Sequence, residues 1–378
     1  MAITQAAWRT RAQSLADGLV QSGALSDLAW HDVFATTPRH LFVPSFSVDD
    51  RSFDGHNPGE LDRWLEAVYQ DDALLTQTRQ QRPTSSSSRP AIMAVMLSLL
   101  EISGADRVLE IGTGTGYNAA LLARRLGAEH VTSIDIDPKL VDQARGRLAE
   151  IGHHPVLVAG DGSNGWAETA PYDRIIVTCA VSSIPPAWIR QLADGGRIVA
   201  PLAGPGGRLM VLDKTAPDEV TGRFDDRPAL FMPLRGAADN PLGPGETVAF
   251  TSAAMPHYGT TTVNPDILID AASPPALFCR LHLPELGIGG EPGPLGSVVV
   301  HTAEAMAEVR RAPLHPGVWP VVQRGTYRPW DTIEVAVRTW HELDRPGHDR
   351  LGITALDSAD RQYVWLDDPN GAHSWPLR

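Results

Sequence analysis

Short, mostly apolar runs alternate with longer amphipathic stretches along the middle of the chain. Such runs are typical of parallel strands, because a strand covered on both faces needs no polar side. They lie at 108–111, 131–135, 155–159, 173–178 and 195–201. The stretches between them carry apolar residues three or four positions apart, which predicts helices. This alternation predicts an α/β fold, a parallel sheet with helices on both faces.

The flanks of this region predict a helical N-terminal part. Apolar spacing predicts helices at 5–22, from a cap at Ser26 or Asp27 to about 34, at 61–69 and at 91–100. Pro90 suits the first turn of the last helix, and the serines before it are natural N-caps. The proline-bounded residues 37–44 predict an extended arm, and the polar residues 49–60 a loop. The segments 208–213 and 229–234 predict an antiparallel pair that closes the sheet.

Beyond residue 236 the pattern changes. The Gly-, Pro- and Asp-rich stretch from 236 to 245 predicts a domain boundary. After it we expect strands at 276–283, 297–301, 351–356 and 361–366, and a helix at 332–343 that begins with the capping box Asp331-x-x-Glu334. The chain is thus expected to comprise an N-terminal arm (1–80), a central domain (81–235) and a smaller α+β domain (236–378).

Composition narrows the classes of function. The net charge of −13 over 378 residues argues against a general nucleic-acid binder. No apolar run approaches the length of a membrane span, and the first residues do not resemble a signal peptide. With only two cysteines, Cys179 and Cys279, we expect a cytoplasmic protein without a disulfide framework. No histidine spacing suggests a metal site. The charge balance favours a small-molecule, peptide or protein substrate.

The first strand runs into a glycine turn, Val108-Leu-Glu-Ile-Gly-Thr-Gly-Thr-Gly-Tyr117, and a helix follows. Glycines allow a ligand to approach the backbone closely. The spacing is G-x-G-x-G, whereas a dinucleotide fingerprint is G-x-G-x-x-G, and no Gly-Lys-Ser/Thr of a phosphate loop follows. An acid lining the turn, Glu110, suits a cationic ligand. A nicotinamide dinucleotide and a turn without any ligand are the competing interpretations.

The ends of the following strands add polar groups to this turn. Asp135 ends the second strand, where a carboxylate can accept hydrogen bonds from ribose hydroxyls. Asp161 follows the third strand and Thr178 ends the fourth. Together these features resemble the class I S-adenosylmethionine-dependent methyltransferases, which have a Rossmann-like sheet. The resemblance implies a set of cofactor-binding residues: Glu110, Gly112, Thr113, Gly114, Gly116, Tyr117, Asp135, Ile136, Asp161, Gly162 and Thr178.

Longer motifs resemble one family of these enzymes, the protein-L-isoaspartate (D-aspartate) O-methyltransferases. They are Thr37-Pro-Arg-His-Leu-Phe-Val-Pro44, Arg107 to Ala120, Gly160-Asp-Gly-Ser163, Tyr172 to Thr178, and Ile184-Pro-Pro with Leu192-x-x-Gly-Gly-Arg-Ile-Val199. Two features depart from the family. Ser87-Ser-Arg-Pro90 stands where the family has I-S-Q-P, the segment over the substrate carboxylate. The repair enzymes are also expected to lack a part like residues 240–378.

These departures resemble a longer actinobacterial branch found in clusters for ribosomally made peptide natural products. The resemblance implies methylation of an aspartyl carboxylate in a macrocyclised peptide, whose ester closes to aspartimide or becomes isoaspartate. Repair of isoaspartyl residues in proteins is the alternative activity, and a cofactor-binding scaffold without turnover is a third possibility. Ser86, Ser87, Ser88 and Arg89 are the candidate residues that hold the carboxylate. A linker or an N-cap is the competing interpretation of the serine run.

Overall fold

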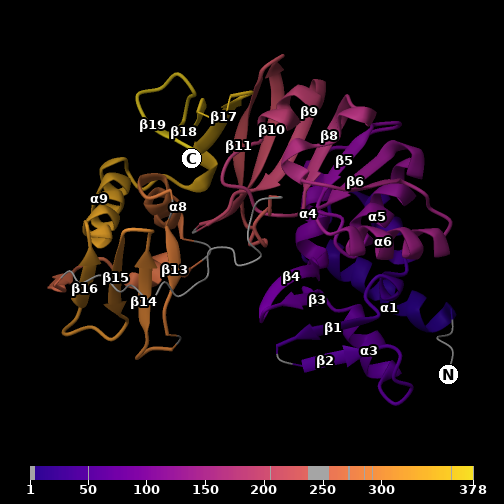
Figure 1. Ribbon diagram of the computed structural model, residues 1–378, viewed down its shortest axis with the longest axis horizontal. Coiled ribbons are helices and arrows are strands. Elements are labelled where there is room, and N and C mark those ends of the chain that lie inside the picture. The colour runs from indigo at the N-terminus through magenta and orange to yellow at the C-terminus, as the bar shows by residue number, and fades with distance from the viewer. Residues whose placement is uncertain are drawn as a thin grey trace.

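The computed structural model of the protein describes residues 5–49, 51–204, 206–236, 255–270, 273–284, 286–291, 293–358 and 360–377. The strands of these residues form three sheets (Figure 1). None of the described helices is long and apolar enough to cross a membrane.

The central sheet has the strand order β19-β18-β17-β11-β10-β9-β8-β5-β6-β7. Strands β9, β8, β5, β6 and β7 are parallel, and the others join antiparallel to them. The bounds are β5 Val108–Ile111, β6 Val131–Asp135, β7 Val156–Ala159, β8 Tyr172–Val177, β9 Leu192–Pro201, β10 Arg208–Ala216, β11 Glu219–Pro228, β17 Leu351–Leu356, β18 Gln362–Leu366 and β19 Ser374–Pro376. The predicted α/β class is therefore confirmed.

Helices cover both faces of this sheet. They are α4 Pro90–Leu99, α5 Tyr117–Leu126, α6 Pro138–Glu150 and α7 Pro186–Gln191. Successive residues of β5 point to opposite faces. Val108 accordingly packs in one core cluster with α4 and α5, and Leu109 in another with Trp188 of α7. The mostly apolar strand pattern thus reflects burial on both sides.

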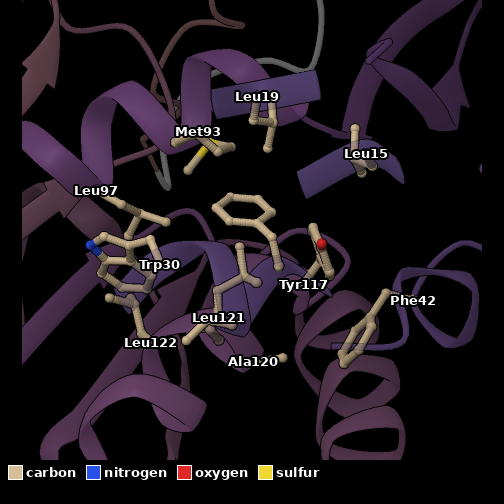
Figure 2. Close-up of a cluster of buried hydrophobic side chains, with 14 of the residues drawn as sticks. Leu15, Leu19, Trp30, Phe42, Met93, Leu97, Tyr117, Ala120, Leu121 and Leu122 are labelled. Atoms are coloured by element: carbon tan, nitrogen blue, oxygen red, sulfur yellow. The ribbon is translucent and has the colours of Figure 1, made fainter. Parts of the chain in front are cut away.

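The N-terminal part packs on the outside of α4 and α5. Its elements are α1 Gln5–Gln21, α2 Leu28–Thr36, α3 Leu61–Val68 and the sheet β2-β1-β3-β4, with β1 Ser45–Val48, β2 Arg51–Asp54, β3 Leu74–Arg79 and β4 Arg82–Ser87. Figure 2 shows Leu19 of α1, Trp30 of α2, Met93 of α4 and Leu121 of α5 in one cluster. Burial of each large side chain contributes about 1.5–3 kcal/mol, so this part is anchored to the central domain.

Two predictions for the N-terminal part are wrong. The expected loop 49–60 contains β2, which pairs with β1 and stacks Phe53 on Phe46 with 5.0 Å between ring centroids. The serines do not cap α4, and Ser85, Ser86 and Ser87 lie in β4. Arg89 is the N-cap residue and makes no side-chain cap, and Asp71 Oδ1 accepts a hydrogen bond from Ala91 N at 2.7 Å instead.

The C-terminal part holds the third sheet, β12-β16-β15-β14-β13, covered on one side by α8 and α9. The bounds are β12 His257–Thr261, β13 Gly287–Gly289, β14 Ser297–His301, β15 Ala305–Arg310, β16 Trp319–Gly325, α8 Pro274–His282 and α9 Pro329–Glu342. The strand predicted at 276–283 is helix α8, which begins with two prolines. The capping box at Asp331 is also wrong, because α9 begins at Pro329 and Asp331 accepts from Gln323 Nε2 at 2.7 Å.

The chain returns to the central sheet at its end. Strand β17 pairs antiparallel with β11, with Gly352 opposite Arg223 and Leu356 opposite Glu219. In Figure 1 the yellow strands β17 to β19 lie beside β11. Residues 351–376 therefore extend the central sheet, in contrast to a division that assigns everything after 236 to a separate domain. Residues 237–245 of the expected boundary lie outside the described residues.

The predicted closing pair of the sheet is also corrected. The partner of β10 is β11, not 229–234, and the latter segment joins the sheet through one bridge between Pro233 and Ala180. Strand β11 was missed because most of its residues are polar and partly exposed.

Candidate functional site

The glycine turn connects β5 to α5 in backbone conformations that favour glycine. Gly112, Gly114 and Gly116 have φ angles of 97°, 51° and 88°. A Cβ atom on Gly112 would lie 2.5 Å from Thr178 Oγ1, and one on Gly116 would lie 2.9 Å from Ala144 Cβ. Larger residues would therefore both strain the turn and collide with β8 or α6.

A cavity of about 580 Å³ opens beside this turn, within the size range of small-molecule sites. Its walls are the glycine turn, strand β4, the ends of β6 and β8, and the segment 230–235. The lining residues are Ala73, Arg82 to Arg89, Ile92, Met93, Ile111 to Thr115, Tyr117, Asn118, Ile134 to Ile136, Gly162, Thr178, Cys179 and Leu230 to Arg235.

Most residues of the predicted cofactor set meet in this cavity. Those that line it are Gly112, Thr113, Gly114, Tyr117, Asp135, Ile136, Gly162 and Thr178. Glu110, Gly116 and Asp161 are not among the lining residues. The Asp161 carboxylate accepts hydrogen bonds from Ser163 N at 2.9 Å and Ser163 Oγ at 2.7 Å, so it shapes the turn that carries Gly162.

Asp135 presents its carboxylate at the end of β6. Its oxygens accept hydrogen bonds from Gly114 N at 2.8 Å and from Asp137 N at 3.0 Å. Burial raises the pKa of this carboxyl group, and the two backbone hydrogen bonds oppose the shift. The bond to Gly114 holds the glycine turn against β6, which places the carboxylate on the cavity wall.

Glu110 lies beneath the turn, with no exposed surface. Asn118 Nδ2 donates to Glu110 Oε1 at 2.7 Å, and Ser133 Oγ donates to the other oxygen. Burial raises the pKa of this carboxyl group to about 7. Contrary to the expectation that it lines the turn, Glu110 supports the turn from within and contacts Asn118 of the cavity wall.

The serine segment forms the opposite wall. All four serines, 85 to 88, line the cavity. A Cβ atom on Gly114 would lie 3.5 Å from the Ser86 carbonyl oxygen and 3.7 Å from Ser85 Oγ, so β4 runs directly against the glycine turn. Arg89 lies at the rim with its side chain 61% exposed, and its Nε contacts Asp71 Oδ2 at 2.7 Å.

Arg39 holds the serine segment in place, a role for which the sequence analysis made no prediction. Its guanidinium is buried and donates to the carbonyls of residues 68, 70, 72 and 88 at 2.8, 3.0, 3.0 and 3.3 Å, and to Ser87 Oγ at 3.5 Å. It also lies over the Tyr117 ring, 5.7 Å from its centroid. Arg39 thereby joins the motif 37–44 to both β4 and the start of α5.

Segment 230–235 was missed as a wall of the site. Ala180 N donates to Met232 O, and Leu234 N donates to Ala180 O, both at 2.8 Å, which places the segment beside the end of β8. Arg235 then reaches across the cavity, and its Nη2 donates to the Thr84 carbonyl at 3.1 Å. No local pattern in the sequence links residue 235 to residue 84. Cys179 also lines the cavity, and burial raises the pKa of its thiol.

Fold and site together define a class I S-adenosylmethionine-dependent methyltransferase: a Rossmann-like sheet, a glycine turn after its first parallel strand, and an acid at the end of the next. The family model of protein-L-isoaspartate (D-aspartate) O-methyltransferase matches residues 60–239. The chain belongs to this family.

Relatives of this family support the assignment. The chain is 36% identical over 225 residues to a protein-L-isoaspartate O-methyltransferase of Methylorubrum populi, which covers 59% of this chain and 94% of that protein. It is 46% identical over 154 residues to protein-L-isoaspartate O-methyltransferase 1 of an Anaeromyxobacter species. This match covers 40% of this chain and 72% of that protein. The enzyme is thus an S-adenosylmethionine-dependent carboxyl O-methyltransferase.

A solved structure shares the fold over nearly the whole length. A protein-L-isoaspartate O-methyltransferase superposes with a TM-score of 0.55 at 22% identity and covers 94% of this chain and 99% of its own. The unmatched 6% is too small to contain everything after residue 236. The expectation that isoaspartate methyltransferases lack such a C-terminal part is therefore wrong for at least this structure.

The cavity fits S-adenosylmethionine. Gly112 and Gly114 line the cavity and carry no side chain that could fill it. Among the described residues, the buried Oδ1 of Asn118 and the hydroxyl of Tyr117, both residues of the cavity wall, have no hydrogen-bond partner. Buried polar groups are normally paired, so these two atoms of residues in the cavity wall lack the partners that such groups usually have.

Proposed function

We propose that this enzyme methylates the carboxylate of isoaspartyl residues in peptides or proteins. The observation that carries the proposal is the serine strand β4, which lies against the glycine turn and lines the same cavity. An acceptor held by these serines would meet the cofactor at the carboxyl ends of β5 and β8, where ligands bind in open parallel sheets. The family and the named activity of its relatives support the choice of acceptor.

The chain's own residues need to do little acid–base work. A free carboxylic acid of the aspartyl type has a pKa of about 3.9, so the acceptor is already ionised at neutral pH. When S-adenosylmethionine is bound, its sulfonium supplies the methyl group: a carboxylate oxygen bonds to the methyl carbon, the sulfur–carbon bond breaks, and the electron pair stays on sulfur. What remains for the protein is to align the acceptor. We assign this task to Ser86 and Ser88, the partly exposed serines of the run, whose hydroxyls can donate to a carboxylate.

A second candidate acceptor is an aspartyl side chain in a macrocyclised, ribosomally made peptide. It is favoured by the cavity wall itself, where Ser87-Ser-Arg-Pro90 replaces the I-S-Q-P pattern that the family resemblance leads one to expect. A different wall predicts a different acceptor shape. The product ester of such a peptide would close to aspartimide with loss of methanol.

Three matched peptides separate these candidates: a linear isoaspartyl peptide, the same linear peptide with aspartate, and a head-to-tail cyclised aspartyl version. Each is incubated with enzyme and S-adenosylmethionine, and the products are measured by mass spectrometry. Gain of one methyl group on the isoaspartyl peptide alone supports the first proposal. Methylation of the cyclised peptide alone, followed by net loss of water relative to the start, supports the second.

Variants then test the role of the serine wall. Ser86→Ala and Ser88→Ala are expected to raise the KM for the peptide. Ser14→Ala is the control, because its hydroxyl bonds to the backbone of α1 far from the cavity. Binding of S-adenosylmethionine without methylation of any of the three peptides would reject both acceptors and favour a scaffold without turnover.

A further inference from the structure

The cavity carries an excess of positive charge in an acidic protein. Three arginines, Arg82, Arg89 and Arg235, line it, against one carboxylate, Asp135. The whole chain has a net charge of −13. Local cationic lining in an anionic protein favours an anionic ligand, because the charges of the wall act on it at short range.

Arg89 is poorly placed to supply this charge. Its Nε contacts Asp71 Oδ2 at 2.7 Å, and its side chain is 61% exposed. The same Asp71 also accepts the hydrogen bond from Ala91 N that starts α4. Movement of Arg89 onto a substrate would therefore break an ion pair, and its exposed charge would be screened by water.

Arg235 lines the same cavity from segment 230–235. Its segment is anchored beside β8 by the two hydrogen bonds between Ala180 and residues 232 and 234. Among the hydrogen bonds found in the described part of the chain, its guanidinium makes one, from Nη2 to the Thr84 carbonyl at 3.1 Å. An arginine has five N–H donors in a fixed fork, so donors remain to bind a ligand beside the serines.

The charges around Arg235 suit a carboxylate ligand. Its positive charge acts on Asp135 and on Cys179, which lies at the end of β8. Its charge also acts on Asp137. An acceptor carboxylate entering the cavity would be repelled by Asp135, and the positive charge of Arg235 offsets this repulsion.

We propose that Arg235 binds the acceptor carboxylate and, with the serines of β4, sets the preference of this enzyme for an anionic acceptor. The inference rests on the proposed function. A fork of two N–H donors can hold both carboxylate oxygens and leave lone pairs for attack on the methyl carbon, because a carboxylate has about four acceptor sites. Arg235 keeps its bond to Thr84, so the contact also fixes the acceptor relative to β4.

The test compares Arg235→Gln and Arg235→Lys with wild type and with Arg145→Gln. Arg145 is an exposed arginine of α6 that pairs with Asp142 outside the cavity, so its variant makes the same change in charge elsewhere. Peptide affinity is measured by calorimetry on enzyme loaded with S-adenosylhomocysteine, for the isoaspartyl or cyclised aspartyl peptide that wild type methylates and for its carboxamide analogue. The affinity for S-adenosylhomocysteine itself is measured in parallel.

In wild type and R145Q we expect the carboxylate peptide to bind roughly 10- to 100-fold more tightly than its carboxamide. In R235Q this ratio should fall towards one, with R235K intermediate, while the affinity for S-adenosylhomocysteine changes less than about threefold. A purely structural role would weaken both peptides equally and leave the ratio intact.

Three outcomes would overturn the inference. A carboxylate-to-carboxamide ratio that is unchanged in R235Q but lost in Arg89→Gln would assign the role to Arg89. Loss of affinity for S-adenosylhomocysteine in R235Q with the ratio intact would assign Arg235 to the cofactor. A wild-type enzyme that methylates no carboxylate peptide would refute the proposed function and the inference with it.

Discussion

Glu110 predicts a specific dependence of stability on pH. Its carboxyl group is buried below the glycine turn, and burial raises its pKa from an ordinary 4.5 to about 7. Between these values the folded protein binds more protons than the unfolded chain. The stabilising contribution of the protonated carboxyl group is therefore fully present below pH 4.5 and is lost as the pH rises through 7.

The magnitude follows from the two pKa values, about 7 when folded and 4.5 when unfolded. Integration of the linkage relation gives a loss of about 2.5 kcal/mol in the free energy of unfolding between pH 5 and pH 8. Glu110→Gln removes the titration but keeps an oxygen to accept from Asn118. Relative to wild type, the free energy of unfolding of this variant should therefore rise by about 2.5 kcal/mol between pH 5 and pH 8.

The assay is urea unfolding of the cofactor-free protein at half-unit steps of pH, followed by tryptophan fluorescence. Glu168→Gln, at an exposed glutamate, is the control and should run parallel to wild type. Parallel curves for wild type and E110Q would refute the reasoning, because they would show that Glu110 binds protons equally in both states. If the stability of E110Q relative to wild type rose towards low pH, this would contradict the predicted sign of the effect.

Three further predictions concern the frame of the site. Gly116→Ala should weaken binding of S-adenosylhomocysteine in calorimetry, and its positive φ alone should lower the free energy of unfolding by about 1–2 kcal/mol. The control Gly146→Ala, with no atom within 4 Å of the new Cβ, should stabilise α6 by about 0.5–1 kcal/mol. Arg39→Met should lower the free energy of unfolding in urea by at least about 3 kcal/mol, with Arg39→Lys recovering part, because several buried acceptors lose their donor; an unchanged midpoint would contradict this. Truncation after residue 345 removes β17, the strand that pairs with β11, so cofactor binding should be lost together with the folded sheet. A truncated protein that binds S-adenosylhomocysteine normally would show instead that the central sheet folds without residues 351–376.

Local patterns were informative wherever one segment carries its own signal. The apolar strands, the glycine turn and the proline at the start of α4 each follow from the residues in place, because burial on two faces, positive φ angles and a missing N–H impose narrow choices. The strand ends also predicted correctly that Asp135 and Thr178 would meet the glycine turn, since parallel strands bring their carboxyl ends to one edge of the sheet.

Local patterns failed where a contact far along the chain decides the structure. The serines before Pro90 look like N-caps, but pairing with β3 makes them a strand. Residues 276–283 are apolar enough for a strand, but packing against α9 and the central sheet makes them a helix. Likewise β2 and β11 are too polar to stand out, and only their neighbours define them.

By itself, then, the sequence determined the parallel strands of the central sheet and the glycine turn, because each depends on residues within one short segment or on the fixed geometry of parallel strands. The class of cofactor followed from the resemblance that these features carry. Only the tertiary structure decided which groups line the cavity. Arg39 contacts Ser87 and Ser88 across 48 and 49 positions, and Arg235 contacts Thr84 across 151. The tertiary structure also decided that strands β17 to β19 complete the central sheet. Such contacts follow from packing of the whole chain, and no spacing within a segment encodes them.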